Sequence, residues 1–247
     1  MKGEMKECLK ELRLPTVLSC YEQQAEEARR EHLSYEQYLG YLMEREREAR
    51  RGKRVERLLR ESRLPLEKNL ESFDRSRLPA KMDAQLSVLL DGSFLDRTEN
   101  VLAFGNPGSG KSHLLCALGQ ELVYMGRRVY FRPCELLIQD LLKAKRDLEL
   151  SRVLKRLRKY EALIIDDIGY VQQSREEMEV LFSLLSDRYE RASVLLTSNL
   201  AFSDWEKIFK DPMTTAAAID RIVHHSIILE LNLPSYRLEE AKRRRKG

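Results

Sequence analysis

The sequence predicts an α/β fold in which a small all-helical N-terminal domain, residues 1–65, precedes a larger domain, residues 66–247. Two observations predict this organisation. The larger domain contains five short β-rich runs that alternate with helix-length segments, which is typical of a parallel sheet covered by helices on both faces. The first 65 residues contain almost no strand-like run, and beyond Gly3 only two glycines interrupt them.

The β-rich runs of the larger domain are the expected strands of a five-stranded parallel sheet. Three of them are almost uniformly apolar, as strands buried on both faces of a parallel sheet should be. Ahead of them, residues 62–79 carry two prolines and little periodicity, so we interpret this stretch as a linker between the two domains. The expected strands are residues 101–104, 128–131, 162–166, 193–198 and 226–231.

The composition limits the compartment and the chemistry. The chain has 247 residues, of which 34% are charged, and a formal net charge of +4. The cysteines are widely spaced, with no Cys-x-x-Cys pair and no histidine at metal-ligand spacing, which favours reduced thiols over a disulfide framework or a zinc site. We find no signal-like apolar segment and no run of membrane-spanning length, so we expect a soluble cytoplasmic protein without a membrane partner. The four cysteines are Cys8, Cys20, Cys116 and Cys134.

The N-terminal domain contains an amphipathic helix that ends in a basic run. Ser34 followed by Gln37 predicts a capping box at the start of this helix. Apolar residues then recur at helical spacing, at Tyr35, Tyr38, Leu39, Leu42 and Met43. Further along, a single glutamate accompanies five basic residues, so this segment is either a solvated helix face or a surface for DNA phosphates. The five candidate DNA-binding residues are Arg50, Arg51, Lys53, Arg54 and Arg57.

A glycine-rich stretch between the first expected strand and the first expected helix predicts a phosphate-binding loop. Its glycines permit positive φ and a close approach of the backbone, so successive N–H groups can point at a phosphate. Lys111 would contact the β- and γ-phosphates of ATP, and the Ser112 hydroxyl would bind Mg²⁺. The alternative is a glycine-rich turn without a ligand. The candidate nucleotide-binding residues are Gly105, Asn106, Pro107, Gly108, Ser109, Gly110, Lys111, Ser112 and His113.

Two aspartates end the third expected strand, at the sheet edge where the phosphate-binding loop also lies. Asp166 is the candidate partner of Mg²⁺, and Asp167 is the candidate residue that orients or deprotonates the attacking water. The alternative is a strand-end pair of aspartates that caps the following turn.

The order of these motifs resembles that of the AAA+ ATPases. In that family the polar residue after the fourth strand, here Asn199, is the sensor that helps to hold the lytic water. In its initiator branch the position of Arg221 carries an arginine finger, which acts on the nucleotide of a neighbouring subunit and accelerates hydrolysis by about 10³–10⁵. The resemblance therefore implies a homo-oligomer. The alternative for Arg221 is a surface ion pair with Asp220.

Two features depart from the AAA+ pattern. Many members have glutamate where this chain has Asp167, and the shorter side chain predicts slow hydrolysis. The chain also ends about fifteen residues after the last expected strand, so we expect no C-terminal lid domain. Arg237 could replace the sensor that a lid normally supplies.

Within AAA+ proteins the chain is most similar to the IstB and DnaC group. The segments that carry this resemblance are "LPLEKNLESFD", "FGNPGSGKSHLLCALG", "LIIDDIGY", "TSN" and "LPSYR". The resemblance implies an ATP-dependent assembly on double-stranded DNA that assists an IstA-type transposase. Two alternatives remain: a DnaC-like loader of a replicative helicase, and a DNA clamp gated by ATP binding with incidental hydrolysis.

A second basic segment lies between the second and third expected strands. In initiator-type AAA+ rings this region faces the central channel, so contacts with DNA phosphates are expected there. The sequence contains no helix-turn-helix or zinc finger, which predicts weak sequence preference and a nucleoid-associated location. The C-terminal "KRRRKG" is either a phosphate-binding arm or a solvated end. The candidate residues of this segment are Lys145, Arg146, Arg152, Lys155 and Arg156.

Overall fold

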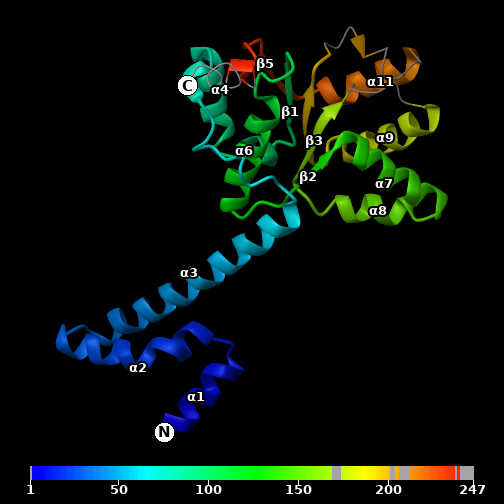
Figure 1. Ribbon diagram of the computed structural model, residues 1–247. Coiled ribbons are helices and arrows are strands. Elements are labelled where there is room, and N and C mark those ends of the chain that lie inside the picture. The colour runs from blue at the N-terminus through cyan, green and yellow to red at the C-terminus, as the bar shows by residue number, and fades with distance from the viewer. Residues whose placement is uncertain (1, 169–173, 201–203, 206–211, 237, 240–247) are drawn as a thin grey trace. The chain divides into compact units, whose positions relative to one another are not determined.

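The computed structural model describes residues 2–168, 174–200, 204–205, 212–236 and 238–239 (Figure 1). The chain forms two compact units, residues 1–57 and residues 58–247. The division falls inside a long helix, whereas the sequence interpretation divides the chain after residue 65. Within the described part of the chain, no helix is both long and apolar enough to cross a bilayer.

The N-terminal unit consists of helices α1 (Lys2–Glu11), α2 (Pro15–Arg30) and most of α3 (Tyr35–Ser62). The predicted capping box is present at the start of α3: the Ser34 amide donates to Gln37 Oε1 at 2.8 Å, and the Gln37 amide donates to Ser34 Oγ at 3.2 Å. The predicted apolar stripe divides between two environments. Tyr38 and Leu42 pack into a small core with Leu9 and Val17, whereas the side chains of Tyr35, Leu39 and Met43 are exposed.

A buried glutamate joins α3 to the start of α2. Leu14, the N-cap residue of α2, provides no side-chain cap. Instead, Glu46 Oε2 accepts hydrogen bonds from the amides of Thr16 at 2.8 Å and Val17 at 3.1 Å, and Oε1 accepts one from Arg50 Nε at 2.9 Å. Burial alone would raise the pKa of Glu46, but these hydrogen bonds outweigh it and hold the pKa below its usual value. A carboxylate from α3 therefore caps α2 across the helix pair.

The second unit is built on a parallel sheet of five strands, which confirms the predicted fold class. The spatial order is β2-β3-β4-β1-β5, so β1 lies between β4 and β5. All five strands run the same way, and their carboxyl ends therefore meet at one edge. The strands are β1 (Asn100–Gly105), β2 (Val129–Pro133), β3 (Ala162–Ile168), β4 (Ser193–Ser198) and β5 (Ser226–Leu231).

Helices cover both faces of the sheet and create two apolar cores (Figure 1). In β3, Ala162 and Ile164 contribute to one core while Leu163 and Ile165 contribute to the other, because successive side chains of a strand point to opposite faces. This explains the uniformly apolar strand. The first core is covered by α4 (Ala80–Leu89), α5 (Ser93–Asp96) and α6 (Lys111–Tyr124), and the second by α7 (Cys134–Arg146), α8 (Leu150–Leu157), α9 (Arg175–Arg188) and α11 (Pro212–Val223).

Candidate nucleotide-binding site

The loop between β1 and α6 has the backbone conformation of a phosphate cradle. Gly108 has φ +78° and Gly110, the N-cap of α6, has φ +99°. A Cβ atom at Gly108 would lie 2.2 Å from Ser235 Oγ, so a side chain there would clash as well as strain the backbone. The loop leads directly into α6, whose free N–H groups and dipole favour an anion at this end.

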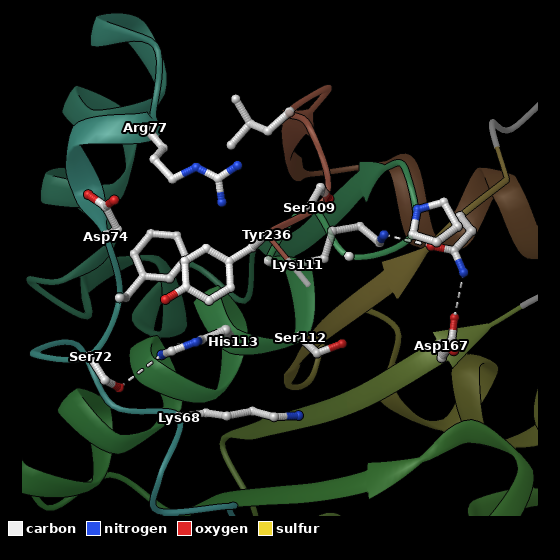
Figure 2. A pocket seen from close by; sticks show the side chains of 16 residues that line it. Lys68, Ser72, Asp74, Arg77, Ser109, Lys111, Ser112, His113, Asp167 and Tyr236 are labelled. Carbon is white, nitrogen blue, oxygen red and sulfur yellow. Dashed lines mark hydrogen bonds between the residues drawn. The ribbon is translucent and has the colours of Figure 1, made fainter. Parts of the chain in front are cut away.

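Three of the predicted site residues come together at the carboxyl edge of the sheet (Figure 2). Lys111 Nζ donates to Asn199 Oδ1 at 2.6 Å and to the carbonyls of Gly105 at 2.8 Å and Asn106 at 2.9 Å. Asn199 Nδ2 in turn donates to Asp167 Oδ1 at 3.0 Å. A lysine from α6, an asparagine after β4 and an aspartate from β3 therefore form one connected polar group.

A bulge in β3 directs the two aspartates differently. The pairing of β3 with β4 shifts register between Ile165 and Ile168, and Asp167 has φ +68°. Thr197, which is buried, bridges the bulge: its Oγ1 accepts the Asp167 amide at 2.7 Å and donates to Asp166 Oδ1 at 2.7 Å. Asp167 lines the site's cavity, whereas Asp166 lies behind it beside Thr197.

The cavity at this edge has a volume of about 230 Å³. The predicted loop residues 107–113 line it together with Asp167 and Asn199. Sequence reasoning gave no site role to its other walls, although the "ESFD" and "LPSYR" segments supply most of them. Those additional lining residues are Lys68, Ser72, Phe73, Asp74, Arg77, Leu233 and Tyr236.

One of these walls is the stretch that the sequence suggested was a linker, and we call residues 65–79 the strap. It is fastened to α6 by Gln120, whose Nε2 donates to the carbonyls of Pro65 at 3.1 Å and Lys68 at 3.0 Å. His113 Nε2 lies 2.9 Å from the Asn69 carbonyl, and a carbonyl can only accept, so this nitrogen carries the proton. The Phe73 ring packs edge-on against His113, with centroids 5.2 Å apart.

The other wall is the segment after β5, residues 232–236, which we call the C-terminal segment. The Tyr236 amide donates to the Gly108 carbonyl at 3.0 Å. Arg77 of the strap holds this segment: it donates to the Pro234 carbonyl at 2.9 Å, lies 5.3 Å from the Tyr236 ring centroid and pairs with Glu239 at 3.1 Å. Arg237, the candidate lid-replacing sensor, lies outside the described residues.

The residues of this cavity fit ATP and Mg²⁺. Ser109 Oγ is buried in the cavity wall, and no hydrogen-bond partner for it is found among the described residues, which suits a polar ligand. The Ser112 hydroxyl points into the cavity (Figure 2). Ser112 and Asp167, which line the cavity, and Asp166, which lies behind it, supply hydroxyl and carboxylate oxygens, the hard donors that Mg²⁺ prefers.

Comparison with known proteins agrees with this geometry. The sequence pattern of the IstB-like ATP binding proteins matches residues 7–244. The chain belongs to this family. It is 43% identical to an insertion sequence ATP-binding protein of Sinorhizobium fredii, over 96% of this chain and 81% of that one. It is 38% identical to the ATP-binding protein of insertion sequence IS21 from Pseudomonas aeruginosa, over 97% of this chain and 91% of that one.

A solved structure supports the fold assignment of this IstB-like chain. The DnaC helicase loader superposes with a TM-score of 0.57 at 18% sequence identity, covering 66% of this chain and 96% of the loader. At that identity the likeness shows the fold alone. The second unit therefore has the AAA+ fold that the order of its motifs predicts.

Arg221 lies apart from the phosphate cradle of its own IstB-like chain. Its Nη1 donates to the Ala217 carbonyl at 2.9 Å, and its guanidinium lies 4.9 Å from the Phe182 ring centroid. It lines a much smaller cavity, of about 20 Å³, with Asn100 and Arg188. Asn100 is the first residue of β1, and Arg188 donates to the carbonyl of Ser193, the first residue of β4. Arg221 therefore lies at the amino-terminal edge of the sheet, whereas Lys111 lies at the carboxyl edge.

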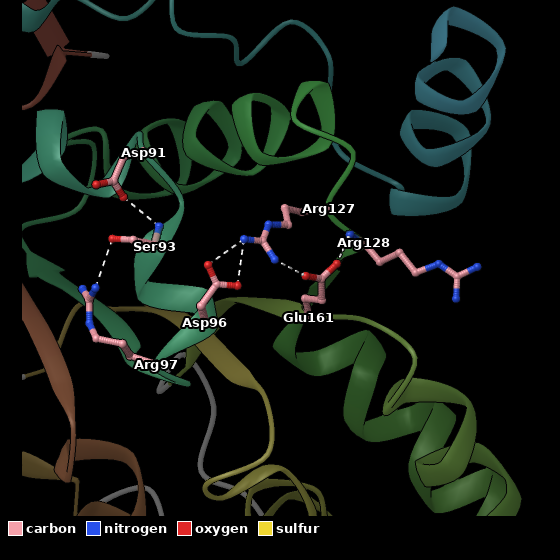
Figure 3. A network of polar contacts seen from close by, with 7 residues as sticks. All are labelled: Asp91, Ser93, Asp96, Arg97, Arg127, Arg128 and Glu161. Carbon is pink, nitrogen blue, oxygen red and sulfur yellow. Dashed lines mark hydrogen bonds and ion pairs between the residues drawn. The ribbon is translucent and has the colours of Figure 1, made fainter. Parts of the chain in front are cut away.

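Buried and bridging arginines stabilise that amino-terminal edge. Arg188 donates to the carbonyls of Leu157 at 3.0 Å and Ser193 at 2.9 Å, and its burial lowers its pKa to about 10. Arg127 bridges Asp96 of α5 and Glu161 ahead of β3, at 2.8 Å from each (Figure 3). Hydrogen bonds to these carboxylates raise the pKa of Arg127. This edge is held by structural contacts, which leaves the opposite edge for the nucleotide.

The predicted DNA-binding residues lie in two different electrostatic settings. Lys145 pairs with Glu179 at 2.7 Å and Arg152 pairs with Glu149 at 2.8 Å. In the described part of the chain, no hydrogen bond or ion pair is found for the exposed side chains of Lys155, Arg156 and Arg146. On α3, Arg50 forms an ion pair with Glu46. The side chains of the other four candidate residues on this helix are exposed: Arg51, Lys53, Arg54 and Arg57.

Proposed function

We propose that this IstB-like protein is an ATPase that assembles on double-stranded DNA and assists a transposase. The observation that carries the proposal is the connected group of Lys111, Asn199 and Asp167 beneath a glycine cradle. A phosphate-binding ammonium, a polar sensor and a carboxylate are the parts that phosphoryl transfer to water requires. Their meeting in one cavity favours hydrolysis over a structural glycine turn.

Each residue of the group has a chemical role in this proposal. Lys111 neutralises charge on the β- and γ-phosphates, and Asp167 accepts a hydrogen bond from the attacking water or takes its proton. Asn199, which contacts both residues, holds that water in line. Mg²⁺, held by Ser112 and Asp166, would neutralise charge that develops on the phosphate oxygens.

Hydrolysis in this proposal is slow until DNA or a partner protein stimulates it. The Asp167 side chain is one methylene shorter than the glutamate common at this position, so its carboxylate stops farther from the γ-phosphate. Its backbone is constrained at φ +68° by the hydrogen bond with Thr197, so it cannot simply extend to compensate. A neighbouring subunit or DNA could shorten the distance between the Asp167 carboxylate and the γ-phosphate by closing the site.

We further propose that the active form is a homo-oligomer in which Arg221 completes the nucleotide site of an adjacent copy. Arg221 lies at the opposite sheet edge from Lys111, so it is poorly placed to act on the nucleotide of its own chain. Its bonds to Ala217 and Phe182 use one face and one nitrogen of the guanidinium. Other N–H groups of the same side chain remain able to contact a phosphate of the adjacent copy.

The proposed DNA surface includes the outer face of α8. Leu157 is buried and Leu154 packs on the core, while Lys155 and Arg156 on the same helix are exposed. Amphipathic anchoring of this kind holds the cations at a fixed position and so reduces the entropy cost of phosphate contacts. Because phosphates are the same in every sequence, we expect weak sequence preference.

The transposase partner is proposed from the names of the relatives, which belong to insertion sequences. A DnaC-like loader role would instead require binding to a replicative helicase. Co-purification of the tagged chain with each candidate, in ATP and in ADP, separates the two: retention of the transposase but not the helicase supports the proposal, and the reverse result overturns it.

The hydrolytic proposal is tested by phosphate release with and without duplex DNA. The wild-type chain should hydrolyse ATP and be stimulated by DNA. Asp167→Asn keeps the size and hydrogen bonding of the side chain but removes the base, so it should bind ATP normally and lose at least about tenfold in rate. An unstimulated, negligible rate that Asp167→Asn leaves unchanged would contradict hydrolysis and leave the nucleotide-gated clamp.

The DNA surface is tested by charge reversal with a matched control. Lys155→Glu with Arg156→Glu should weaken binding of all duplex sequences and reduce the dependence of affinity on salt, since fewer counterions are released. Lys81→Glu with Arg128→Glu changes the net charge equally at exposed positions on α4 and ahead of β2. Equal losses in both double variants would mean that only overall charge matters and that α8 is not the surface.

A further inference from the structure

We propose that Glu190, His224 and His225 form a binding site for a divalent transition metal such as Zn²⁺. The three residues lie in the turns that follow α9 and α11. One ligand atom from each, two imidazole nitrogens and a carboxylate oxygen, lies within 4.8 Å of the other two. Among the residues that the structure describes, these three form the one group of at least three histidine, cysteine or carboxylate side chains whose ligand atoms lie this close together.

The donor set selects the class of metal. Two imidazoles and one carboxylate are typical ligands of Zn²⁺ and of neighbouring transition metals, whereas Mg²⁺ and Ca²⁺ prefer oxygen donors alone. In a tetrahedral zinc site with bonds of about 2.0–2.1 Å, neighbouring donors are about 3.4 Å apart. The three donors must therefore move together by roughly an ångström. All three side chains are exposed, so rotation about their side-chain bonds can achieve this.

A hydrogen bond from outside the three ligands already orients one of them. The Tyr189 hydroxyl lies 3.0 Å from His224 Nδ1, which leaves Nε2 of that ring for a metal. Zinc-bound histidines usually have such a partner on the second ring nitrogen, and it fixes both the tautomer and the ring direction. The rings of His224 and His225 are neighbours, with centroids 4.0 Å apart.

The surrounding charges permit a cation at this position. Arg188 and Arg221 line the adjacent small cavity, but both guanidiniums are directed to backbone carbonyls, and Arg221 also contacts an aromatic ring. The Glu190 carboxylate offsets part of their positive charge, and Asp220 is near enough to act on the Tyr189 hydroxyl electrostatically. When Glu190 binds the metal ion, its negative charge reduces the repulsion between the ion and the two arginines.

A metal here would join two segments that are distant in sequence. Glu190 follows α9, and the histidines follow α11, three and four residues after Arg221. A bound ion would therefore fix the end of α11 against the end of α9. This consequence concerns the stability of the unit, and it does not depend on nucleotide hydrolysis.

The test is metal binding by the full chain, without an affinity tag and after removal of metal by EDTA. Cys8 and Cys20 are changed to serine in every protein compared, because accessible thiols bind Zn²⁺ themselves. Zn²⁺ is titrated against a chromogenic chelator, and Co²⁺ is titrated while the visible absorption of tetrahedral cobalt is recorded. One equivalent of each metal should bind, and Zn²⁺ should raise Tm.

The variants separate a three-ligand site from a simple pair of adjacent histidines. His225→Ala and Glu190→Gln should each weaken Zn²⁺ binding at least about tenfold and abolish the rise in Tm. His32→Ala is the matched control, because His32 is also exposed and also has positive φ, but lies in the N-terminal unit. Wild-type affinity in Glu190→Gln, an equal loss in His32→Ala, or the lack of a one-equivalent site would each overturn the proposal.

Discussion

Replacing Thr197 by valine should slow ATP hydrolysis about 30-fold while changing nucleotide affinity little. The Thr197 hydroxyl holds both aspartates of β3 and does not line the nucleotide cavity. It donates to the carboxylate of Asp166 and accepts the amide of Asp167, each at 2.7 Å. Valine has nearly the same shape as threonine, so the substitution removes these two bonds without leaving a cavity.

The size of the effect follows from these two bonds. A hydrogen bond to an ionised carboxylate contributes about 1.5–3 kcal/mol, and an amide left buried without an acceptor costs about 1–3 kcal/mol. The bulge can relax to recover part of this energy, and by relaxing it moves the Asp167 carboxylate. If about 2 kcal/mol of the loss falls on the transition state, the rate falls about 30-fold, since each 1.36 kcal/mol is a factor of ten.

The assay is steady-state phosphate release at saturating Mg²⁺ and ATP, with binding of a fluorescent ATP analogue measured separately. Thr197→Ser is the matched variant because it keeps the hydroxyl and loses only a methyl group, and it should retain most of the activity. Thermal unfolding of both variants monitors the fold. A valine variant that hydrolyses ATP at the wild-type rate, or a serine variant that is equally impaired, would refute the positioning role of Thr197.

Three further predictions concern binding, stability and reactivity. Gly108→Ala should lower nucleotide affinity at least tenfold with its circular dichroism unchanged, because alanine is strained at φ +78° and its Cβ would also displace the Ser235 side chain; wild-type affinity would contradict the cradle geometry. Glu46→Gln should lower the free energy of unfolding in urea by about 1 kcal/mol at pH 7. The folded pKa of Glu46 is lowered, so this difference should be complete above its unfolded pKa and vanish as the pH falls through the folded value; a difference that persists there would contradict the assignment. Burial raises the pKa of Cys116 to about 12, so iodoacetamide at pH 8 should modify the exposed Cys8 and spare Cys116, as mass spectrometry of the native chain would show.

The sequence predicted those parts of the fold that depend on local pattern. The five β-rich runs became five strands: the last two match the expected bounds, and the ends of the first three differ from them by at most two residues. β1, for example, begins at Asn100 and not at Val101. Asn100 is polar, but its side chain donates to the Ile222 carbonyl and accepts the Val194 amide, both distant in sequence. A contact of that kind has no signature in a local window, so the strand boundary could not be placed from composition.

The walls of the nucleotide cavity were missed for a related reason. The phosphate-binding loop is one continuous motif, whereas the strap ends 26 positions before Gly105 and the C-terminal segment begins more than a hundred residues after the loop. Prolines and weak periodicity in residues 62–79 correctly indicated irregular backbone. Irregular backbone does not distinguish a solvated linker from a segment fastened by Gln120 and His113. Only the folded chain reveals that these residues approach α6.

Charge patterns carried similar ambiguity. The basic residues before β3 were grouped by composition, but Lys145 is paired with a glutamate 34 positions away, while Lys155 and Arg156 are exposed on the outer face of α8. The bulge in β3 is a second case. Strict alternation of strand side chains would send Asp166 and Asp167 to opposite faces, and it gives no reason for Asp167 to turn toward Asn199.

The strap and the C-terminal segment make the nucleotide cavity sensitive to parts of the chain outside the AAA+ motifs. Arg77 contacts the C-terminal segment through the Pro234 carbonyl and the Tyr236 ring, and it pairs with Glu239 just beyond, so neither wall can move without disturbing the other. The C-terminal segment is bonded directly to the Gly108 carbonyl of the cradle. Both walls line the cavity, so a displacement of either would change the shape of the nucleotide site without altering the phosphate-binding loop itself.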